Sequence, residues 1–220
     1  MTMKLFISGA TGRMGKLICK LAQESNAWQL TDDFETCQII IDFSAPEGTE
    51  KALTLARERK IPIVIGTTGL NETQKAQVTA AAKEIPVVFS PNMSVGVNLL
   101  FKLIETAAKT LEKDYKIKIS ETHHIHKKDK PSGTAKRMGE IVEKIRKEKP
   151  PIESIREGEV IGDHTIIFGN DAEHLAILHR AVDRQVFAAG ALKAAQWIIG
   201  KSPGLYTMQD VLGLERALVR

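Results

Sequence analysis

The stretch LFISGATGRMG, residues 5–15, decides the fold class of this chain. Its opening residues are apolar, as in a buried strand, and a glycine-rich turn follows at once. Apolar residues then recur from Met14 to Ala22 at the spacing of one helix face. We therefore predict a strand at 5–7, a tight turn, and a helix from 12 to about 24.

The glycines of this turn, Gly9, Gly12 and Gly15, follow a G-x-x-G-x-x-G spacing, a variant of the dinucleotide-binding fingerprint. Without side chains, the backbone can approach a pyrophosphate at the positive end of a helix. Arg13 adds a fixed positive charge. The order of strand, turn and helix favours a dinucleotide site over an ordinary glycine turn.

The chain up to residue 94 keeps alternating short apolar runs with helical segments. Ser44 and Glu47 match a capping box for a second helix, with Pro46 in its first turn. Such alternation is typical of a parallel sheet with crossover helices. Strands are expected at 39–43, 61–65 and 87–89, and a further helix at 71–83.

The pattern changes after Ser94, where strands outnumber helices. A second unit with mostly antiparallel strand pairing is therefore expected there. The helices at the end of the chain should pack on the first domain. Thr207 and Asp210 match a capping box for the last of these helices. The segments concerned are helices at 97–111, 134–147 and 186–199 and strands at 116–120, 152–157, 164–168 and 174–180.

The predicted fold class is therefore α/β. A Rossmann-like domain with a parallel sheet is expected from residues 1–94 and 185–220, and an inserted α+β domain with a mixed or antiparallel sheet from residues 95–184.

The adenine end of the first domain is predicted to be trimmed. Residues 25–38 leave no room for a strand, a crossover helix and a second strand. Asp32, Asp33 and Glu35 are the candidates for holding the adenine ribose, and a solvated acidic turn is the alternative. No ribose ligand is assigned among them.

Two further loops follow predicted strands, at 66–68 and 90–93. The carboxyl edge of an open parallel sheet is where ligands bind. Each loop alone fits a plain turn, but three loops on one edge favour a nucleotide site.

The stretch ETHHIHKKDKPSGT, residues 121–134, contains three of the six histidines. A metal site is disfavoured because neighbouring histidines face opposite ways on an extended chain and the nearby lysines repel a cation. Two other interpretations of the block stay open. One is a solvated polar loop. The other is an anion and proton-transfer site: a helix beginning at Ser132, Gly133 and Thr134 can receive a carboxylate, and a lysine beside a histidine can donate a proton.

The composition supports a small-molecule site. The net charge is +4 and aromatic residues make up 5%, which disfavours nucleic-acid binding. Cys19 and Cys37 are too few for a disulfide framework, and no run reaches the roughly 18 apolar residues of a membrane span. We expect a cytoplasmic protein that binds neither nucleic acid nor membrane.

The chain closely resembles the 4-hydroxy-tetrahydrodipicolinate reductases, formerly dihydrodipicolinate reductases, of bacterial lysine and diaminopimelate synthesis. The resemblance covers nearly the whole chain, and the histidine–lysine block followed by PSGTA is its most specific part. The motifs are GATGRMG at 9–15, IDFSAPEGT at 41–49, GTTG at 66–69, SPNMSVGVN at 90–98, ETHHIHKKDKPSGTA at 121–135 and FAAGALKAA at 187–195.

The resemblance implies that His123 is a proton donor and acceptor and that Lys127 is the general acid. It implies that His124, Gly133 and Thr134 hold a small dicarboxylate, to which the helix start adds Ser132. It also implies NADPH or NADH as cofactor and a homotetramer formed through the sheet of the second domain. The implied cofactor residues are Gly9, Ala10, Thr11, Gly12, Arg13, Met14, Gly66, Thr67, Thr68, Ser90, Pro91, Asn92 and Met93.

Three departures from the family affect the expectation. Ile125 stands where many members have arginine, Ala45 where some have a basic residue, and the region after Trp28 is short, which leaves the cofactor preference open. The competing functions are a non-enzymatic dinucleotide-binding redox sensor and another nicotinamide-dependent amino-acid dehydrogenase. Neither needs the histidine–lysine block.

Overall fold

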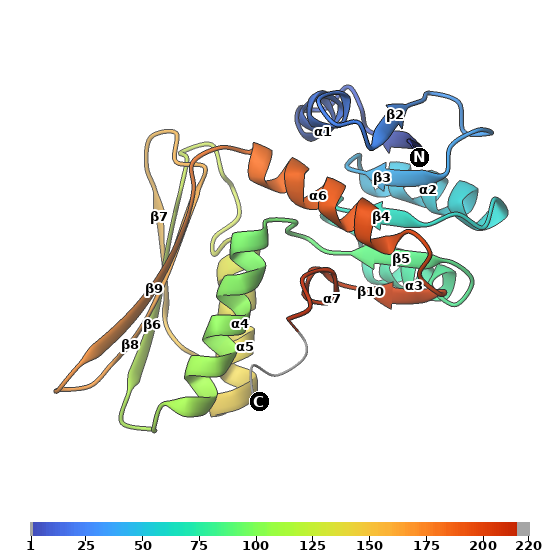
Figure 1. Ribbon diagram of the computed structural model, residues 1–220. Helices are drawn as coiled ribbons and strands as arrows, with labels where there is room; N and C mark the ends of the chain where they lie inside the picture. Colours follow the sequence, from blue (N-terminus) through green and yellow to red (C-terminus); the bar gives the residue numbers. More distant parts are fainter. Residues whose placement is uncertain (1, 215–220) are drawn as a thin grey trace. The chain divides into compact units, whose positions relative to one another are not determined.

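The computed structural model describes residues 2–214, and these form two compact units (Figure 1). Unit 1 runs to Val95 and resumes at Arg184, and unit 2 spans Gly96–Asp183. No helix among the described residues is long and apolar enough to cross a bilayer.

Unit 1 is a parallel six-stranded sheet in the order β10-β5-β4-β3-β1-β2. Its fold is the predicted Rossmann-like α/β arrangement. Its strands are β1 (Met3–Ser8), β2 (Trp28–Leu30), β3 (Ile39–Asp42), β4 (Ile63–Ile65), β5 (Pro86–Phe89) and β10 (Gly204–Tyr206), and its helices are α1 (Arg13–Gln23), α2 (Pro46–Glu58), α3 (Glu72–Ala81), α6 (Gln185–Ile198) and α7 (Met208–Val211).

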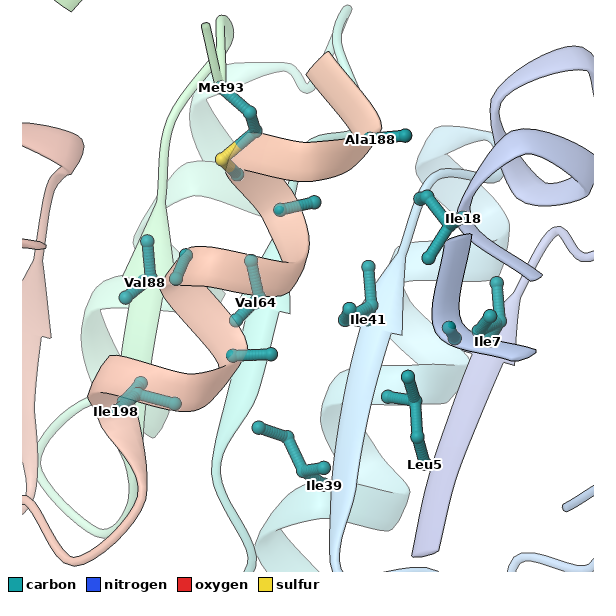
Figure 2. Close-up of a cluster of buried hydrophobic side chains, with 14 of the residues drawn as sticks. Leu5, Ile7, Ile18, Ile39, Ile41, Val64, Val88, Met93, Ala188 and Ile198 are labelled. Atoms are coloured by element: carbon teal, nitrogen blue, oxygen red, sulfur yellow. The ribbon is translucent and has the colours of Figure 1, made fainter. Parts of the chain in front are cut away.

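Helices cover both faces of this sheet because its strands are apolar on both sides. Helices α1 and α6 pack on one face, where Ile18 and Ala188 meet Ile41 and Val64 (Figure 2). Helices α2 and α3 pack on the other face through a second apolar cluster. The small residues of α6 allow close approach, since a Cβ on Gly190 would lie 1.8 Å from the Met93 carbonyl oxygen.

Unit 2 is a four-stranded mixed sheet in the order β7-β6-β8-β9, with two helices on one face. Strands β6 and β7 are parallel and the other pairs are antiparallel. Figure 1 shows no helix of this unit on the other face. The elements are α4 (Val95–Thr110), β6 (Lys116–His123), α5 (Gly133–Arg146), β7 (Ile152–Arg156), β8 (Gly162–Gly169) and β9 (His174–Ala181).

The predicted capping box at Ser44 and Glu47 is wrong. Helix α2 has Ala45 as its N-cap, with no side-chain cap, although Pro46 does occupy the first turn. The Ser44 hydroxyl instead donates to the Asp42 carboxylate and to the Ala45 carbonyl. Donation to a buried carboxylate is a charge-assisted hydrogen bond, which is stronger than the neutral bond that a first-turn N–H would give to the Ser44 hydroxyl oxygen. The capping box of Thr207 and Asp210 is confirmed.

Two short strands, β2 and β10, were not predicted. Each has three residues and pairs parallel with one neighbour, β1 or β5, at an edge of the sheet. Residues 31–38 then lead from β2 to β3 without a helix.

Candidate functional site

The three loops predicted to hold a dinucleotide lie at one edge of the unit 1 sheet. The strand ends are in register, with Ser8 beside Asp42, Asp42 beside Ile65, and Ile65 beside Phe89. Backbone hydrogen bonds continue past the strands, from Gly66 N to Asp42 O at 2.9 Å and from Ser90 N to Ile65 O at 3.1 Å. The loops at 9–14, 66–68 and 90–93 therefore begin along the same edge, and the end of β3 lies between the first two.

The first loop is held tight by its glycines. Gly9 has a φ of +82°, which favours glycine, and a Cβ on Gly15 would lie 2.1 Å from the Gly9 carbonyl oxygen. Gly12 is the N-cap of α1 and supplies no side chain to the first-turn N–H groups. Thr11 and Arg13 are exposed on this turn, and Ala10 and Met14 are half-buried. A helix start of this kind fits a phosphate, so the residues present suit a dinucleotide.

A buried carboxylate that the sequence analysis did not single out organises the second loop. Asp42 is fully buried and accepts hydrogen bonds from the hydroxyls of Thr67 at 2.7 Å and Thr49 at 2.5 Å, as well as from Ser44. Ser44 N also donates to the Thr67 hydroxyl oxygen at 2.9 Å. The signal was an aspartate ending an otherwise apolar strand.

These bonds divide the roles within the 66–68 loop. The Thr67 side chain is committed to Asp42 and is 4% exposed, whereas Thr68 is exposed. Gly66 lies against the Phe43 ring, where a Cβ would come within 2.2 Å of the ring. Thr67 therefore shapes the loop, and the backbone and Thr68 face outward from it.

The third loop is shaped by its own side chains. Ser90 Oγ donates to the Asn92 carbonyl at 2.9 Å, and Ser94 N donates to Asn92 Oδ1 at 2.9 Å. Met93 is 1% exposed and its side chain packs into the core against α6 (Figure 2). Pro91 is exposed. At Met93, only the backbone is placed to meet a ligand at this edge.

The acidic segment after β2 presents its carboxylates to solvent. Asp33 Oδ1 accepts from Glu35 N at 2.9 Å, and both Asp32 and Asp33 are exposed. Arg59 donates to the carbonyl oxygens of Phe34 and Cys37 and so fixes the backbone of this segment. The structure does not single out one of the three acidic residues as a ribose ligand.

In unit 2, the end of β6 places His123 on the face that α4 and α5 cover. Ile119, Glu121 and His123 alternate onto this face and are all buried. The Nδ1 atom of His123 forms a hydrogen bond with Glu121 Oε2. The chain turns after this strand, since Lys127 N donates to the His124 carbonyl oxygen at 3.1 Å.

Glu121 lies at the centre of a network that the sequence analysis missed. Its Oε1 atom accepts from Arg156 Nη2 at 2.9 Å and from Ser132 N at 3.3 Å. The Arg156 guanidinium also donates to the carbonyl oxygens of Lys127 at 3.2 Å and Asp129 at 2.5 Å. The network therefore joins His123 to the loop that carries Lys127.

Helix α5 begins at the predicted residues. Ser132 is its N-cap, and the Ser132 hydroxyl accepts from Ala135 N at 3.2 Å and lies 3.2 Å from His164 Nε2. Ser132 is 2% exposed, so its hydroxyl is used inside the protein. Gly133 is exposed, and a Cβ there would meet nothing within 4 Å.

Lys127 is only partly exposed, and its Nζ atom pairs with Asp129 Oδ1 at 2.7 Å. His124 is half-buried, whereas Ile125 and His126 are exposed. The rings of His124 and His126 lie 6.1 Å apart between centroids, whereas His123 pairs with Glu121 on the buried side of β6. Within residues 2–214, no group of three histidine, cysteine, aspartate or glutamate residues could hold a metal ion.

The environment keeps the buried histidines neutral. Burial lowers the pKa of His123, against the opposing effect of Glu121. Burial, together with the charges of His123 and His179, lowers the pKa of His164 to about 3. Burial opposes ionisation of Glu121, but its hydrogen bonds from Arg156 and His123 outweigh burial and lower its pKa. At neutral pH the cluster holds one carboxylate paired with one guanidinium.

Comparisons with known proteins agree across both units. The family described as "Dihydrodipicolinate reductase, C-terminus" matches residues 96–212, and "Dihydrodipicolinate reductase, N-terminus" matches residues 3–38 and 27–93. A 4-hydroxy-tetrahydrodipicolinate reductase from Hahella chejuensis is 46% identical over 207 residues, covering 85% of this chain and 76% of the relative.

A relative with the same name from Geobacter sulfurreducens is 37% identical over 264 aligned positions, covering 96% of this chain and 99% of the relative. Because 264 positions exceed the 220 residues of this chain, the relative carries sequence that this chain lacks. The two N-terminal matches overlap at residues 27–38, where the short adenine end was expected.

Solved structures show the same fold. A dipicolinate-bound dihydrodipicolinate reductase from Paenisporosarcina sp. TG-14 has a TM-score of 0.81 at 20% identity, covering 96% of this chain and 99% of that chain. A DAP dehydrogenase from C. glutamicum in complex with DAP has a TM-score of 0.54 at 11% identity and covers 99% of this chain and 97% of that chain.

Proposed function

The chain belongs to the dihydrodipicolinate reductase family, and from this premise we propose that it reduces 4-hydroxy-tetrahydrodipicolinate to tetrahydrodipicolinate. The reaction consumes NADPH or NADH and one proton and releases water and the oxidised cofactor. The observation that carries the proposal is the cluster in unit 2, in which Glu121 and Arg156 hold His123 and the Lys127 loop beside the start of α5.

The proposal assigns the cofactor to unit 1. Residues 9–14 would receive the pyrophosphate at the start of α1, where no side chain caps the helix. The loops at 66–68 and 90–93 would line the same edge, with Thr67 and Met93 acting through loop shape and backbone. The bound nicotinamide supplies the hydride.

The substrate is assigned to unit 2. The start of α5 at Gly133 and Thr134 carries partial positive charge and would receive a substrate carboxylate, with His124 nearby in the sequence block. Ser132 would contribute by capping the helix, because its hydroxyl is already used.

Proton transfer is assigned to His123 and Lys127. His123 uses Nδ1 for Glu121, which leaves Nε2 to exchange a proton. Lys127 would be the general acid, released from its ion pair with Asp129 when substrate arrives. Loss of the substrate hydroxyl as water leaves an electrophilic ring carbon for the hydride.

Two further assignments belong to the proposal. Residues 1–94 with 185–220 form the dinucleotide-binding domain, and residues 95–184 form the substrate-binding and oligomerisation domain of a homotetramer. The enzyme works in the cytoplasm, in keeping with its two free cysteines.

The test is a spectrophotometric assay with substrate generated by the preceding synthase. We expect oxidation of NADH or NADPH that depends on the synthase product. Cofactor binding without turnover would instead indicate a redox sensor. Oxidation of amino acids with NAD(P)⁺, without reduction of the synthase product, would indicate an amino-acid dehydrogenase.

A further inference from the structure

The cluster in unit 2 contains a buried ion pair whose part in proton transfer goes beyond the proposed function. The side chains of Glu121 and Arg156 are 0% and 8% exposed, and the distance between Oε1 and Nη2 is 2.9 Å. Removing one partner of such a pair destabilises the fold, because the other charge is left buried without a partner. The pair itself is stable only when hydrogen bonds satisfy the remaining oxygens and N–H groups. Here both Glu121 oxygens are used, one by His123 and the other by Arg156 and Ser132 N.

We propose that Glu121 and Arg156 are positioning residues for proton transfer: Glu121 fixes the tautomer and orientation of His123, and Arg156 ties that carboxylate to the backbone of the Lys127 loop. This inference rests on the proposed function, because it gives His123 and Lys127 their roles.

The first step concerns the tautomer of His123. A carboxylate can only accept a hydrogen bond, so the contact between Glu121 Oε2 and Nδ1 requires a proton on Nδ1. The neutral ring then carries a lone pair on Nε2. That atom lies toward Gly162, where a Cβ would come within 2.9 Å of it. The absence of a side chain at Gly162 therefore allows the backbone of β8 to pack closely against this nitrogen.

The second step concerns the loop. Arg156 extends from the end of β7, where it pairs in register with His123. Its Nε and Nη2 atoms reach the carbonyls of Lys127 and Asp129, so one guanidinium spans the carboxylate and two points of the loop. A planar group with fixed N–H directions suits this task, and a lysine could not reproduce it.

The third step concerns the charges around His123. Glu121 raises its proton affinity, whereas the positive charges of Lys127 and Arg156 lower it. His164 contacts the ring edge at 5.0 Å between centroids and is uncharged at neutral pH, and His179 lies behind it at 6.4 Å from His164. Further charges in this region come from Asp129 of the loop and from Asp163 of β8, which pairs with Arg180 of β9 at 2.7 Å.

The decisive experiment is a ¹⁵N NMR titration of the histidines in the full-length protein without ligands. The wild-type His123 should be neutral at pH 7, with its proton on Nδ1. In Glu121→Gln the titration should move to lower pH and the preference for the Nδ1 tautomer should weaken. In Arg156→Gln it should move to higher pH, because a positive charge is lost.

An exposed ion pair on α5 supplies the matched controls. Arg137 and Glu140 form an ion pair with both side chains about 60% exposed. Glu140→Gln and Arg137→Gln remove the same charges from unit 2 without touching the network, so the His123 titration should stay at its wild-type position. Shifts of equal size in these controls would overturn the proposal.

Kinetics give the second readout. We expect kcat/KM of Glu121→Gln to fall about 10²-fold, which is within the range of general acid–base catalysis. In the pH profile of kcat/KM, the change that reports the ionisation of His123 should move to lower pH. Arg156→Lys should lower kcat more than it raises KM. An unchanged tautomer and titration in both network variants would refute the proposal even if the enzyme is active.

The two hypotheses can fail separately. If the wild-type protein does not reduce the synthase product, the proposed function fails. The NMR titration still tests whether Glu121 and Arg156 set the tautomer and the titration of His123. If Glu121→Gln does not fold, Arg156→Gln and Arg156→Lys decide: a shift to higher pH only in the Gln variant supports the proposal, and no shift refutes it.

Discussion

Single residues of the histidine–lysine block differ sharply in their surroundings. His123 is buried in a hydrogen-bond network, Lys127 is partly exposed beside one carboxylate, and His126 is 70% exposed. Chemistry should therefore depend on His123 and Lys127 and little on His126, although the three lie within five positions.

Replacing Lys127 tests its role as general acid. We expect Lys127→Ala to lower kcat by about 10²- to 10³-fold and to change KM much less, since proton donation stabilises mainly the transition state. Steady-state kinetics with synthase-generated substrate measure both constants. Lys128→Ala, at the exposed neighbour, is the control and should remain near wild type. A near-normal kcat for Lys127→Ala would remove Lys127 from the chemistry.

His164 should make the protein sensitive to acid. Its pKa in the folded state is about 3, below the ordinary 6.5, because burial and neighbouring histidines disfavour the charged ring. Its stabilising contribution is therefore complete above pH 6.5 and is lost as the pH falls toward 3. Between pH 7 and 4.5 this one group should cost about 2–3 kcal/mol of unfolding free energy.

Urea unfolding at the two pH values measures this loss. We expect His164→Asn to lose less stability on acidification than the wild type, by about that amount. His126→Asn, at an exposed position, should follow the wild-type curve. Equal losses in His164→Asn and the wild type would show that His164 does not carry the effect.

At the scale of elements, the short edge strand β2 ends directly at the acidic segment 31–35. The segment contains no lysine or arginine, and the nearby Arg59 is committed to the carbonyls of Phe34 and Cys37. A 2′-phosphate on the adenine ribose would meet carboxylates here, whereas a ribose hydroxyl could donate to them.

We therefore predict that NADH is preferred over NADPH, by about tenfold in kcat/KM, since repulsion between charges about 4 Å apart costs 1 kcal/mol or more. The preference should shrink with added salt. Asp32→Ser should shift the ratio several-fold toward NADPH, and Glu58→Ser at the exposed end of α2 should not. A wild-type preference for NADPH would contradict this interpretation of the segment.

At the scale of the whole molecule, one sheet face of unit 2 is left without a helix. Helices α4 and α5 pack on one face, and the register places Thr165, Ile167 and Leu178 on the other. Ile167 and Leu178 are 37% and 58% exposed, and Ile155 of β7 is 39% exposed. Apolar side chains gathered on an open sheet suit an interface between subunits.

We expect the wild-type protein to sediment as a tetramer and Ile167→Glu with Leu178→Glu to sediment as smaller species, because buried carboxylates without partners oppose association. Sedimentation equilibrium gives the masses. Leu99→Glu on α4, where the leucine is 43% exposed, is the control and should keep the wild-type mass. A monomeric wild type, or an intact tetramer in the double variant, would exclude this face as the interface.

The sequence by itself determined the class of fold and the chemistry-bearing segments. The glycine turn at 9–15, the apolar strands and the helix start at Ser132 are local patterns, so periodicity and spacing within a few residues suffice to predict them. The histidine–lysine block was also visible, because its residue types are concentrated in one stretch.

Only the tertiary structure decided which partners these residues have. Glu121 meets Arg156 and His164 because β6 pairs in register with β7 and β8, strands far away in the sequence. Asp42 collects the hydroxyls of Ser44, Thr49 and Thr67 from three segments, and Met93 turns into the core instead of the loop surface.

The same reason explains the errors and omissions. The strands β2 and β10 are too short for a periodic signal and exist because β1 and β5 offer them hydrogen-bond partners. Ser44 matches a local capping pattern, yet a buried carboxylate takes its hydroxyl. Local spacing fixes what a segment can form, whereas burial and non-local pairing decide which of the possible partners it keeps.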